Sequence, residues 1–334
     1  MNYRRLGRAG VKVSQLCLGC MNFGGKTSEE DTCTIIDRAL DAGINFLDTA
    51  NIYSRGASEI AVGKALNRNS KRDVVVLATK VNGKMDKNDP ISGGNHRREI
   101  ISQAEASLKR LGTDWIDLYQ IHRPQSDIPI DETLRALDDL VRSGKVRYIG
   151  TSTFAAWQVV ESLWVSRELG LNRFVTEQPP YHLLDRRIER ELVPMAQTYG
   201  IALLPWSPLA GGFLAGKHRQ GQAPPPRSRL AQASSVHPDL LAEPAYAALG
   251  EIEKIAQGRN CTVSQLALGW CMNQPGITSP IIGPRTMEHL EDNLAAVNVE
   301  ITAEVRQMID KVCPPGLNVV QFYDADFGPH RFRI

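Results

Sequence analysis

The sequence alternates between strand-like and helix-like segments with a period of roughly 30–45 residues, a pattern typical of repeated βα units. The strand candidates are residues 15–18, 45–48, 74–80, 115–122, 148–151, 174–178, 202–205 and 280–282. Eight strands, each followed by a helix, predict an α/β protein built as a (β/α)8 TIM barrel. An open doubly wound sheet is the alternative, but its Gly-x-Gly-x-x-Gly motif is missing from the sequence.

Capping residues predict where several helices begin and end. Ser28, followed by three acidic residues, is a good helix N-cap, and Gly43 is a good stop signal. The stretches 130–143 and 286–297 are amphipathic and predict two further helices. These helices fall between strand candidates, as the barrel requires.

Three segments fall outside the repeat, although we expect residues 1–334 to form a single barrel domain. Residues 2–13 are predicted to form a short β-hairpin before the first strand. Residues 217–240 form a long loop after strand seven, and residues 313–334 form a C-terminal tail that is rich in aromatic side chains. Long irregular segments in a compact domain are usually functional, so we expect the loop and the tail to shape a substrate pocket.

Composition excludes several classes of protein. The formal net charge is only +2, and no basic stripe of the kind found in nucleic-acid-binding proteins is present. No apolar run approaches the roughly 20 residues of a membrane helix, and the first residues do not resemble a signal peptide. We therefore expect a soluble, cytoplasmic protein that binds neither nucleic acid nor membranes.

Cys17 and Cys20 form a Cys-x-x-Cys motif, which in other proteins serves metal binding or redox chemistry. A structural zinc site needs about four ligands, and no second close cysteine pair exists among the 6 cysteines. The motif lies in an apolar strand-like run, where residues three apart point to opposite faces. We expect both thiols to be buried and inert, and we predict no metal site.

Four polar residues lie at or just after the ends of strand candidates: Asp48, Tyr53, Lys80 and His122. In a barrel of parallel strands these ends share one rim, which is where active sites lie. A phenol releases its proton more readily beside an ammonium group, and a buried carboxylate keeps that ammonium group charged. A neutral imidazole supplies a hydrogen-bond donor for a substrate oxygen. The set therefore predicts proton transfer to a carbonyl oxygen, whereas a Schiff-base role for Lys80 is the competing interpretation.

These residues and their flanking motifs resemble the aldo-keto reductases over roughly residues 2–312. The stretch NFLDTANIY at residues 45–53 resembles the family's first signature, with its Asp and Tyr. Ser58-Glu59 and GKAL at 63–66 continue it. The later motifs are ATK at 78–80, DLYQIHRP at 117–124, GKVRYIGTS at 144–152, EQPPY at 177–181, WSPL at 206–209 and IIGPRT at 281–286.

The resemblance implies an NADP(H)-dependent carbonyl reductase in which Tyr53 is the general acid. Lys80 would assist proton release, Asp48 would hold Lys80, and His122 would orient the carbonyl. The residues implied to bind NADP(H) are Gly19, Met21, Asp48, Ser152, Gln178, Trp206, Ser207, Pro208, Leu209, Gly211, Lys217, Ile282, Gly283, Arg285, His289, Asp292 and Asn293. The expected pocket for an aldehyde, ketone or sugar-like carbonyl contains Phe23, Tyr53, His122, Tyr181 and Trp206.

The phosphate-binding side also follows from the residues themselves. The sequence GGFLAGKH at residues 211–218 nearly matches a P-loop but has His218 in place of Ser or Thr, so a Mg-nucleotide site is not expected. A Gly-rich loop with Lys217 still suits a pyrophosphate, and Arg285 precedes a predicted helix N-terminus. Relative to the family, Thr153 replaces a common Asn, His289 a common Gln, Asp292 a common Glu and Ile282 a frequent Pro.

Two other interpretations stay open at this point. One is a non-catalytic NADP(H)-binding regulator on the same fold, like the β-subunits of potassium channels. The other is a metal-dependent barrel lyase or isomerase, although the predicted rim has no clear set of His, Asp and Glu ligands. The physiological substrate, the preferred direction of the reaction and the oligomeric state do not follow from the sequence.

Overall fold

The computed structural model describes residues 1–68, 70–225, 228, 230–232, 238–324 and 328–329. Among them, parallel strands form an 8-stranded sheet in the order β10-β3-β4-β5-β6-β7-β8-β9. The strands are β3 (Cys17–Gly19), β4 (Phe46–Asp48), β5 (Val76–Val81), β6 (Ile116–Ile121), β7 (Val146–Ser152), β8 (Thr176–Gln178), β9 (Ala202–Leu203) and β10 (Ile281–Ile282). The backbone N–H of Ile281 donates to the carbonyl of Pro205 over 2.8 Å and links the two ends of the sheet. The predicted (β/α)8 fold is confirmed.

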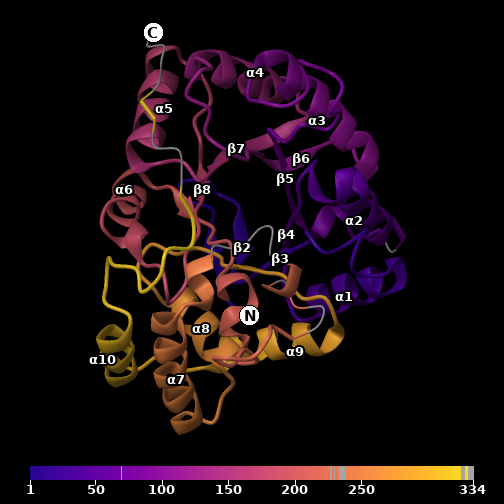
Figure 1. Ribbon diagram of the computed structural model, residues 1–334. Helices are drawn as coiled ribbons and strands as arrows, with labels where there is room; N and C mark the ends of the chain where they lie inside the picture. Colours follow the sequence, from indigo (N-terminus) through magenta and orange to yellow (C-terminus); the bar gives the residue numbers. More distant parts are fainter. Residues whose placement is uncertain (69, 226–227, 229, 233–237, 325–327, 330–334) are drawn as a thin grey trace.

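Helices surround the strands, as Figure 1 shows. They are α1 (Glu29–Asp41), α2 (Ala57–Arg68), α3 (Arg97–Leu111), α4 (Ile130–Arg142), α5 (Ala156–Glu168), α6 (Leu192–Tyr199), α7 (Glu243–Gly258), α8 (Val263–Met272), α9 (Met287–Ala295) and α10 (Ala303–Val312). The short 3-10 helices are η1 (Tyr53–Gly56), η2 (Arg72–Val74), η3 (Arg187–Glu189), η4 (Ala210–Ala215), η5 (Leu230–Gln232), η6 (Pro238–Leu241) and η7 (Ala296–Asn298). Ser28 caps α1 by accepting the N–H of Asp31 over 3.0 Å, as its sequence predicts.

The observed strands begin or end a residue or two away from the predicted ones. Residues 72–74 form η2, so the strand predicted over 74–80 begins only at Val76. The strand predicted over 202–205 ends at Leu203, because Pro205 has no N–H to give to a neighbouring strand. The shifts at the carboxyl ends are two residues or fewer, so the same strand ends still meet at one rim.

Two clusters of apolar side chains fill the molecule. One lies inside the barrel and includes Cys17, Phe46 and Leu118, together with Leu6 and Val13 from the N-terminal hairpin. The other lies between the strands and the surrounding helices and includes Cys20. Cys17 and Cys20 are both fully buried, on opposite sides of the strand, and burial raises the pKa of each thiol, which confirms the prediction that they are buried.

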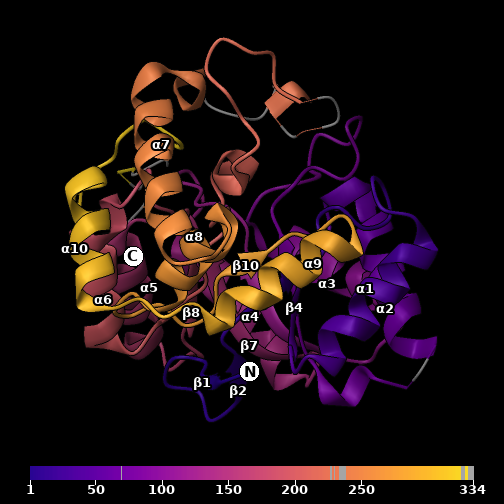
Figure 2. The same ribbon diagram turned by 90° about the horizontal axis from the view of Figure 1, so that it is seen from below.

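The hairpin and the long loop lie at opposite ends of the barrel (Figure 2). The antiparallel hairpin consists of β1 (Tyr3–Arg5) and β2 (Lys12–Ser14). The loop after β9 and the tail lie on the side of the carboxyl ends of the strands, and Val319 in the tail donates its N–H to Leu184 over 2.9 Å. Phe327 and Phe332 of the predicted tail lie outside the described residues. No helix in the described part of the chain is long and apolar enough to cross a membrane.

Candidate active site

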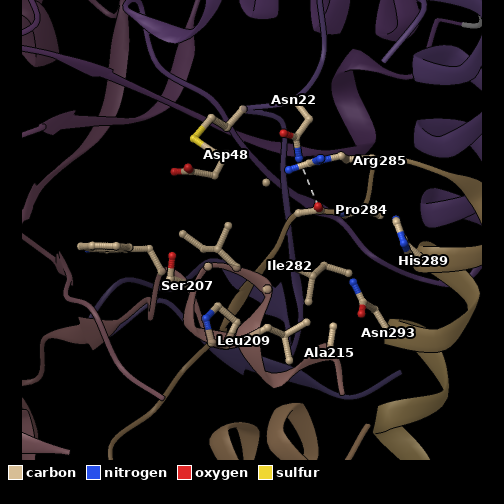
Figure 3. A pocket seen from close by; sticks show the side chains of 18 of the residues that line it. Asn22, Asp48, Ser207, Leu209, Ala215, Ile282, Pro284, Arg285, His289 and Asn293 are labelled. Atoms are coloured by element: carbon tan, nitrogen blue, oxygen red, sulfur yellow. Dashed lines mark hydrogen bonds between the residues drawn. The ribbon is translucent and has the colours of Figure 1, made fainter. Parts of the chain in front are cut away.

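The carboxyl ends of the strands open into a cleft with a cavity volume of ≈ 360 Å³. The strand register places the key positions at one level, since Gly19 pairs with Asp48, Lys80 with Gln120, and Ser152 with Gln178. Every residue that the family resemblance assigns to the cofactor lines this cleft. Figure 3 shows that these side chains come from segments far apart in the sequence.

Asp48, Lys80 and Tyr53 form a connected chain at the base of the cleft. Asp48 ends β4, Lys80 lies near the end of β5, and Tyr53 opens η1. The ammonium group of Lys80 donates to Asp48 Oδ1, to the carbonyl of Thr49 over 2.8 Å and to Tyr53 Oη over 3.3 Å. Lys80 is fully buried, whereas Tyr53 lines the cleft. The hydrogen-bonded residues therefore connect the protein interior with the open cleft.

Asp48 is held by further hydrogen bonds from its other carboxylate oxygen. Gln120 and Gln178 donate to Asp48 Oδ2 over 3.1 Å and 3.0 Å. Burial lowers the pKa of Lys80, but attraction to Asp48 and hydrogen bonding outweigh it, and the pKa is raised overall. Lys80 is therefore a cation, whereas a Schiff-base nucleophile requires a neutral amine, and the aldolase-like interpretation is disfavoured.

His122 lies directly beyond β6 and faces Tyr53. The two ring centroids are 5.6 Å apart, with an angle of 82° between the ring planes. Burial, followed by the positive charges of Lys80 and Arg123, holds the pKa of His122 well below its usual range. The imidazole is therefore neutral at ordinary pH and has one N–H to donate.

The tail reaches the rim of the cleft beside Trp206. The rings of Phe322 and Tyr323 lie 5.8 Å and 5.3 Å from the ring of Trp206. The guanidinium group of Arg123, which also lines the cleft, lies 5.9 Å from the centroid of Trp206 and 5.4 Å from that of Tyr323. Arg123 received no role from the sequence pattern, although its position directly after His122 was a usable signal.

Two residues expected in the substrate pocket lie elsewhere. Phe23 and Tyr181 are fully buried and do not line the cleft, so their assignment to the pocket was wrong. The ring of Tyr181 packs 5.1 Å from that of Trp270, and its hydroxyl donates to Glu189 over 2.5 Å. Both residues lie in loops after strands, where no periodicity fixes the direction of a side chain.

The cleft also has a basic end that suits phosphate groups. Gly211 and Gly212 in η4 adopt φ angles of 65° and 99°, which favour glycine, and Lys217 follows them. Burial, followed by the charge of Arg285, lowers the pKa of Lys217. Two basic side chains that disfavour each other's charge gain stability when an anion binds between them. These residues therefore fit the phosphates of a dinucleotide.

Asp292 is one of the departures from the family pattern, and its carboxylate near this basic end is hydrogen-bonded to other residues. Its Oδ1 accepts hydrogen bonds from Thr262 over 2.9 Å and from Gln265 over 2.8 Å. Both partners belong to the start of α8, so they draw the carboxylate toward that helix. Asn293, the next residue, lines the same side of the cleft (Figure 3).

Thr153 adopts a strained backbone conformation beside Ser152. Its φ of 60° lies in the left-handed region, which Asn tolerates better than a β-branched residue. We expect Thr153→Asn to raise the free energy of unfolding by about 0.5–1 kcal/mol, measured by chemical denaturation. Thr153→Val removes the hydroxyl and keeps the β-branched side chain and its strain, so it should give no gain. Equal or lower stability of the Asn variant would contradict this interpretation.

Comparison with known proteins places the chain in a family. The family model "Aldo/keto reductase family" matches residues 15–313. The chain is 40% identical to an uncharacterized oxidoreductase, YrpG, of Bacillus subtilis over 97% of this chain and 99% of the relative. It is 34% identical to the versiconal hemiacetal acetate reductase of Aspergillus parasiticus, over 94% of this chain and 98% of the relative. The chain therefore belongs to the aldo/keto reductase family, whose members generally use NAD(P)H.

A second type of relative is also present. The chain is 33% identical to a probable voltage-gated potassium channel subunit beta of rice, Oryza sativa subsp. japonica, over 93% of this chain and 95% of the relative. The family and the oxidoreductases among the relatives support an oxidoreductase that acts on small-molecule carbonyl compounds. The channel-subunit relatives fit the regulatory interpretation.

Proposed function

We propose that this protein reduces an aldehyde, a ketone or a sugar-like carbonyl to the alcohol with NADPH, and that Tyr53 donates the proton. The observation that carries this proposal is the position of the Lys80 ammonium group. It is fully buried, contacts Asp48, and lies 3.3 Å from Tyr53 Oη at the base of the cleft.

The proton transfer follows from the charges around Tyr53. The cation on Lys80 stabilises the phenolate that remains after Tyr53 gives up its proton. The neutral His122 donates one N–H to the carbonyl oxygen and directs that oxygen toward Tyr53 Oη. As the carbonyl oxygen gains negative charge, Tyr53 transfers its proton to it and the alcohol forms.

The cleft supplies groups that suit both ends of NADP(H). Ser152 and Gln178 would hold the carboxamide of the nicotinamide near Asp48, and the ring of Trp206 would lie beside the nicotinamide. The loop of Gly211 with Lys217 and Arg285 would hold the phosphates. When bound, the cofactor supplies the hydride that adds to the carbonyl carbon.

The first test of this function combines binding with turnover. NADPH should quench the tryptophan fluorescence of the protein, because Trp206 lies in the cleft. A generic aromatic aldehyde should then oxidise the bound NADPH catalytically. Binding without any oxidation across a panel of aldehydes, ketones and keto-sugars would contradict the enzymatic proposal and favour the regulatory one.

The alternative function is a non-catalytic NADP(H)-binding regulatory subunit. It draws support from the relatives that carry the name of a channel subunit beta. The connection among Asp48, Lys80 and Tyr53 fits catalysis, but regulators of this kind keep much of the same set, so turnover of a carbonyl compound is what separates the two functions.

We expect metal removal to leave turnover unchanged. The proposed proton transfer uses only Asp48, Tyr53, Lys80 and His122, and the described residues contain no group of three or more His, Cys, Asp or Glu side chains that could hold a metal ion. Activity should be equal before and after dialysis against EDTA. Loss of activity that added zinc or magnesium restores would overturn this expectation.

A further inference from the structure

Two histidines line the basic end of the cleft beside Lys217 and Arg285. His218 follows Lys217 in the loop after β9, and His289 lies in the first turn of α9, which Thr286 caps by accepting the N–H of His289 over 3.3 Å. Figure 3 shows His289 and Arg285 on the side of the cleft that lies away from Asp48. An anion bound at the start of α9 would therefore lie in a pocket lined by two histidines, one lysine and one arginine.

His218 is buried without a hydrogen-bond partner. The residue is 2% exposed, and neither ring nitrogen makes a well-formed hydrogen bond within the described part of the chain. The ring stacks on Phe213, with centroids 5.6 Å apart and 15° between the planes. A buried imidazole always carries at least one N–H, and leaving that donor unpaired is unfavourable. A ligand with acceptor oxygens in the cleft would satisfy it.

The surroundings of His218 disfavour its charged form. Burial and the charge of Lys217, with a smaller contribution from Arg219, lower its pKa. A polar contact of the ring with the backbone of Gly212 opposes them, although this contact does not have the geometry of a hydrogen bond. Arg219 is itself paired with Glu253 of α7 over 3.0 Å, which weakens its influence. His218 is therefore neutral near neutral pH before a ligand binds.

His289 has a similar balance of charges. Burial, followed by Lys217 and then Arg285, lowers its pKa, against the opposing effects of Glu288 and Asp292 on its own helix. Asp292 is also engaged by Thr262 and Gln265 at the start of α8. A dianionic phosphate beside these groups would reverse the balance for both histidines, because a nearby negative charge favours the imidazolium form.

We propose that His218 and His289 take up a proton when a 2′-phosphorylated dinucleotide binds, so that the preference for NADP(H) over NAD(H) strengthens as the pH falls. This inference rests on the proposed function, because it assigns the cofactor's phosphate to this end of the cleft. The direction follows from linkage: both histidines are neutral in the free protein, and the phosphate-bound protein holds more protons. The uptake of one proton makes the affinity rise by up to about tenfold for each unit of pH lost.

Isothermal titration calorimetry of the full chain with NADP+ and NAD+ tests this inference. Titrations at about pH 7.5, where a phosphate monoester is mostly dianionic, in two buffers with different ionisation enthalpies give the number of protons taken up. We expect NADP+ to take up roughly half a proton or more beyond any uptake with NAD+. Equal uptake with the two dinucleotides would overturn the inference.

Three variants assign the protons to residues. The double variant His218→Asn with His289→Gln should lose the extra uptake. A far-UV circular dichroism spectrum and a thermal unfolding midpoint close to those of the wild type would show that it is folded. Lys217→Arg keeps a positive charge that does not titrate, so its extra uptake should persist. Uptake that survives in the double variant, or that disappears in Lys217→Arg, would overturn the inference. Binding of neither dinucleotide to the wild-type protein would overturn the proposed function together with the inference, whereas tight NADP+ binding without extra uptake would overturn the inference alone.

Discussion

Tyr53→Phe should lower turnover by roughly 10²–10⁴, which is the usual contribution of general acid catalysis. The substitution removes only the hydroxyl and keeps the ring beside His122. Lys80 should keep its contacts with Asp48 and the carbonyl of Thr49, so the fold should not change. Single-turnover kinetics with NADPH and a generic aldehyde would measure the loss in the step of hydride transfer.

The control for this experiment is a hydroxyl removed elsewhere in the barrel. Tyr148 lies on β7 and packs against the apolar cluster inside the barrel, so Tyr148→Phe should leave turnover nearly unchanged. NADPH affinity of the Tyr53→Phe variant should stay within a few-fold of the wild type. If that variant keeps more than a tenth of wild-type turnover while hydride transfer limits the rate, Tyr53 is not the acid.

Arg285→Ala should weaken NADPH binding by roughly 10–150-fold and change NADH binding little. NADPH differs from NADH by one phosphate group, and a hydrogen bond to a charged group is worth roughly 1.5–3 kcal/mol, which corresponds to that range of affinity. Arg285 lines the cleft just before the N-cap of α9, where the helix dipole also favours an anion. Fluorescence titrations with both cofactors give the two dissociation constants.

A matched variant separates charge from geometry at this position. Arg285→Lys keeps the positive charge but loses the paired donors of the guanidinium group, so its affinity for NADPH should fall between those of the wild type and Arg285→Ala. An equal loss for NADPH and NADH in Arg285→Ala would show that Arg285 does not recognise the 2′-phosphate.

The sequence predicted the fold and the grouping of the candidate proton-transfer residues at one rim, because both follow from regular features. Alternating strand and helix patterns define a parallel barrel, and parallel strands bring their carboxyl ends to one rim. Asp48, Lys80 and His122 lie at strand ends, so their neighbourhood follows from the register alone. The burial of Phe23 and Tyr181 could not be predicted, because both lie in loops that turn back into the core. Loops have no hydrophobic periodicity that would indicate the direction of a side chain.

The histidines at the basic end show a second limit of prediction. His289 was listed among the residues implied to bind NADP(H) and noted as a departure from the family pattern, whereas His218 was noted only as a substitution that breaks a P-loop motif. The burial of His218 depends on stacking against Phe213 after the chain turns at Gly211 and Gly212. Such a contact within a long loop depends on tertiary packing that local sequence does not specify.

Transfer of deuterium from NADPH deuterated at the nicotinamide C4 position tests the central claim most directly. The protein should transfer the deuterium to the carbonyl carbon of an aldehyde. When the label is on the face of the nicotinamide from which the hydride leaves, mass spectrometry should find one deuterium in each molecule of alcohol. The Tyr53→Phe variant should give the same labelled product far more slowly. An alcohol without the label, or tight binding of NADPH with no alcohol formed from any carbonyl in the panel, would contradict the proposed reduction.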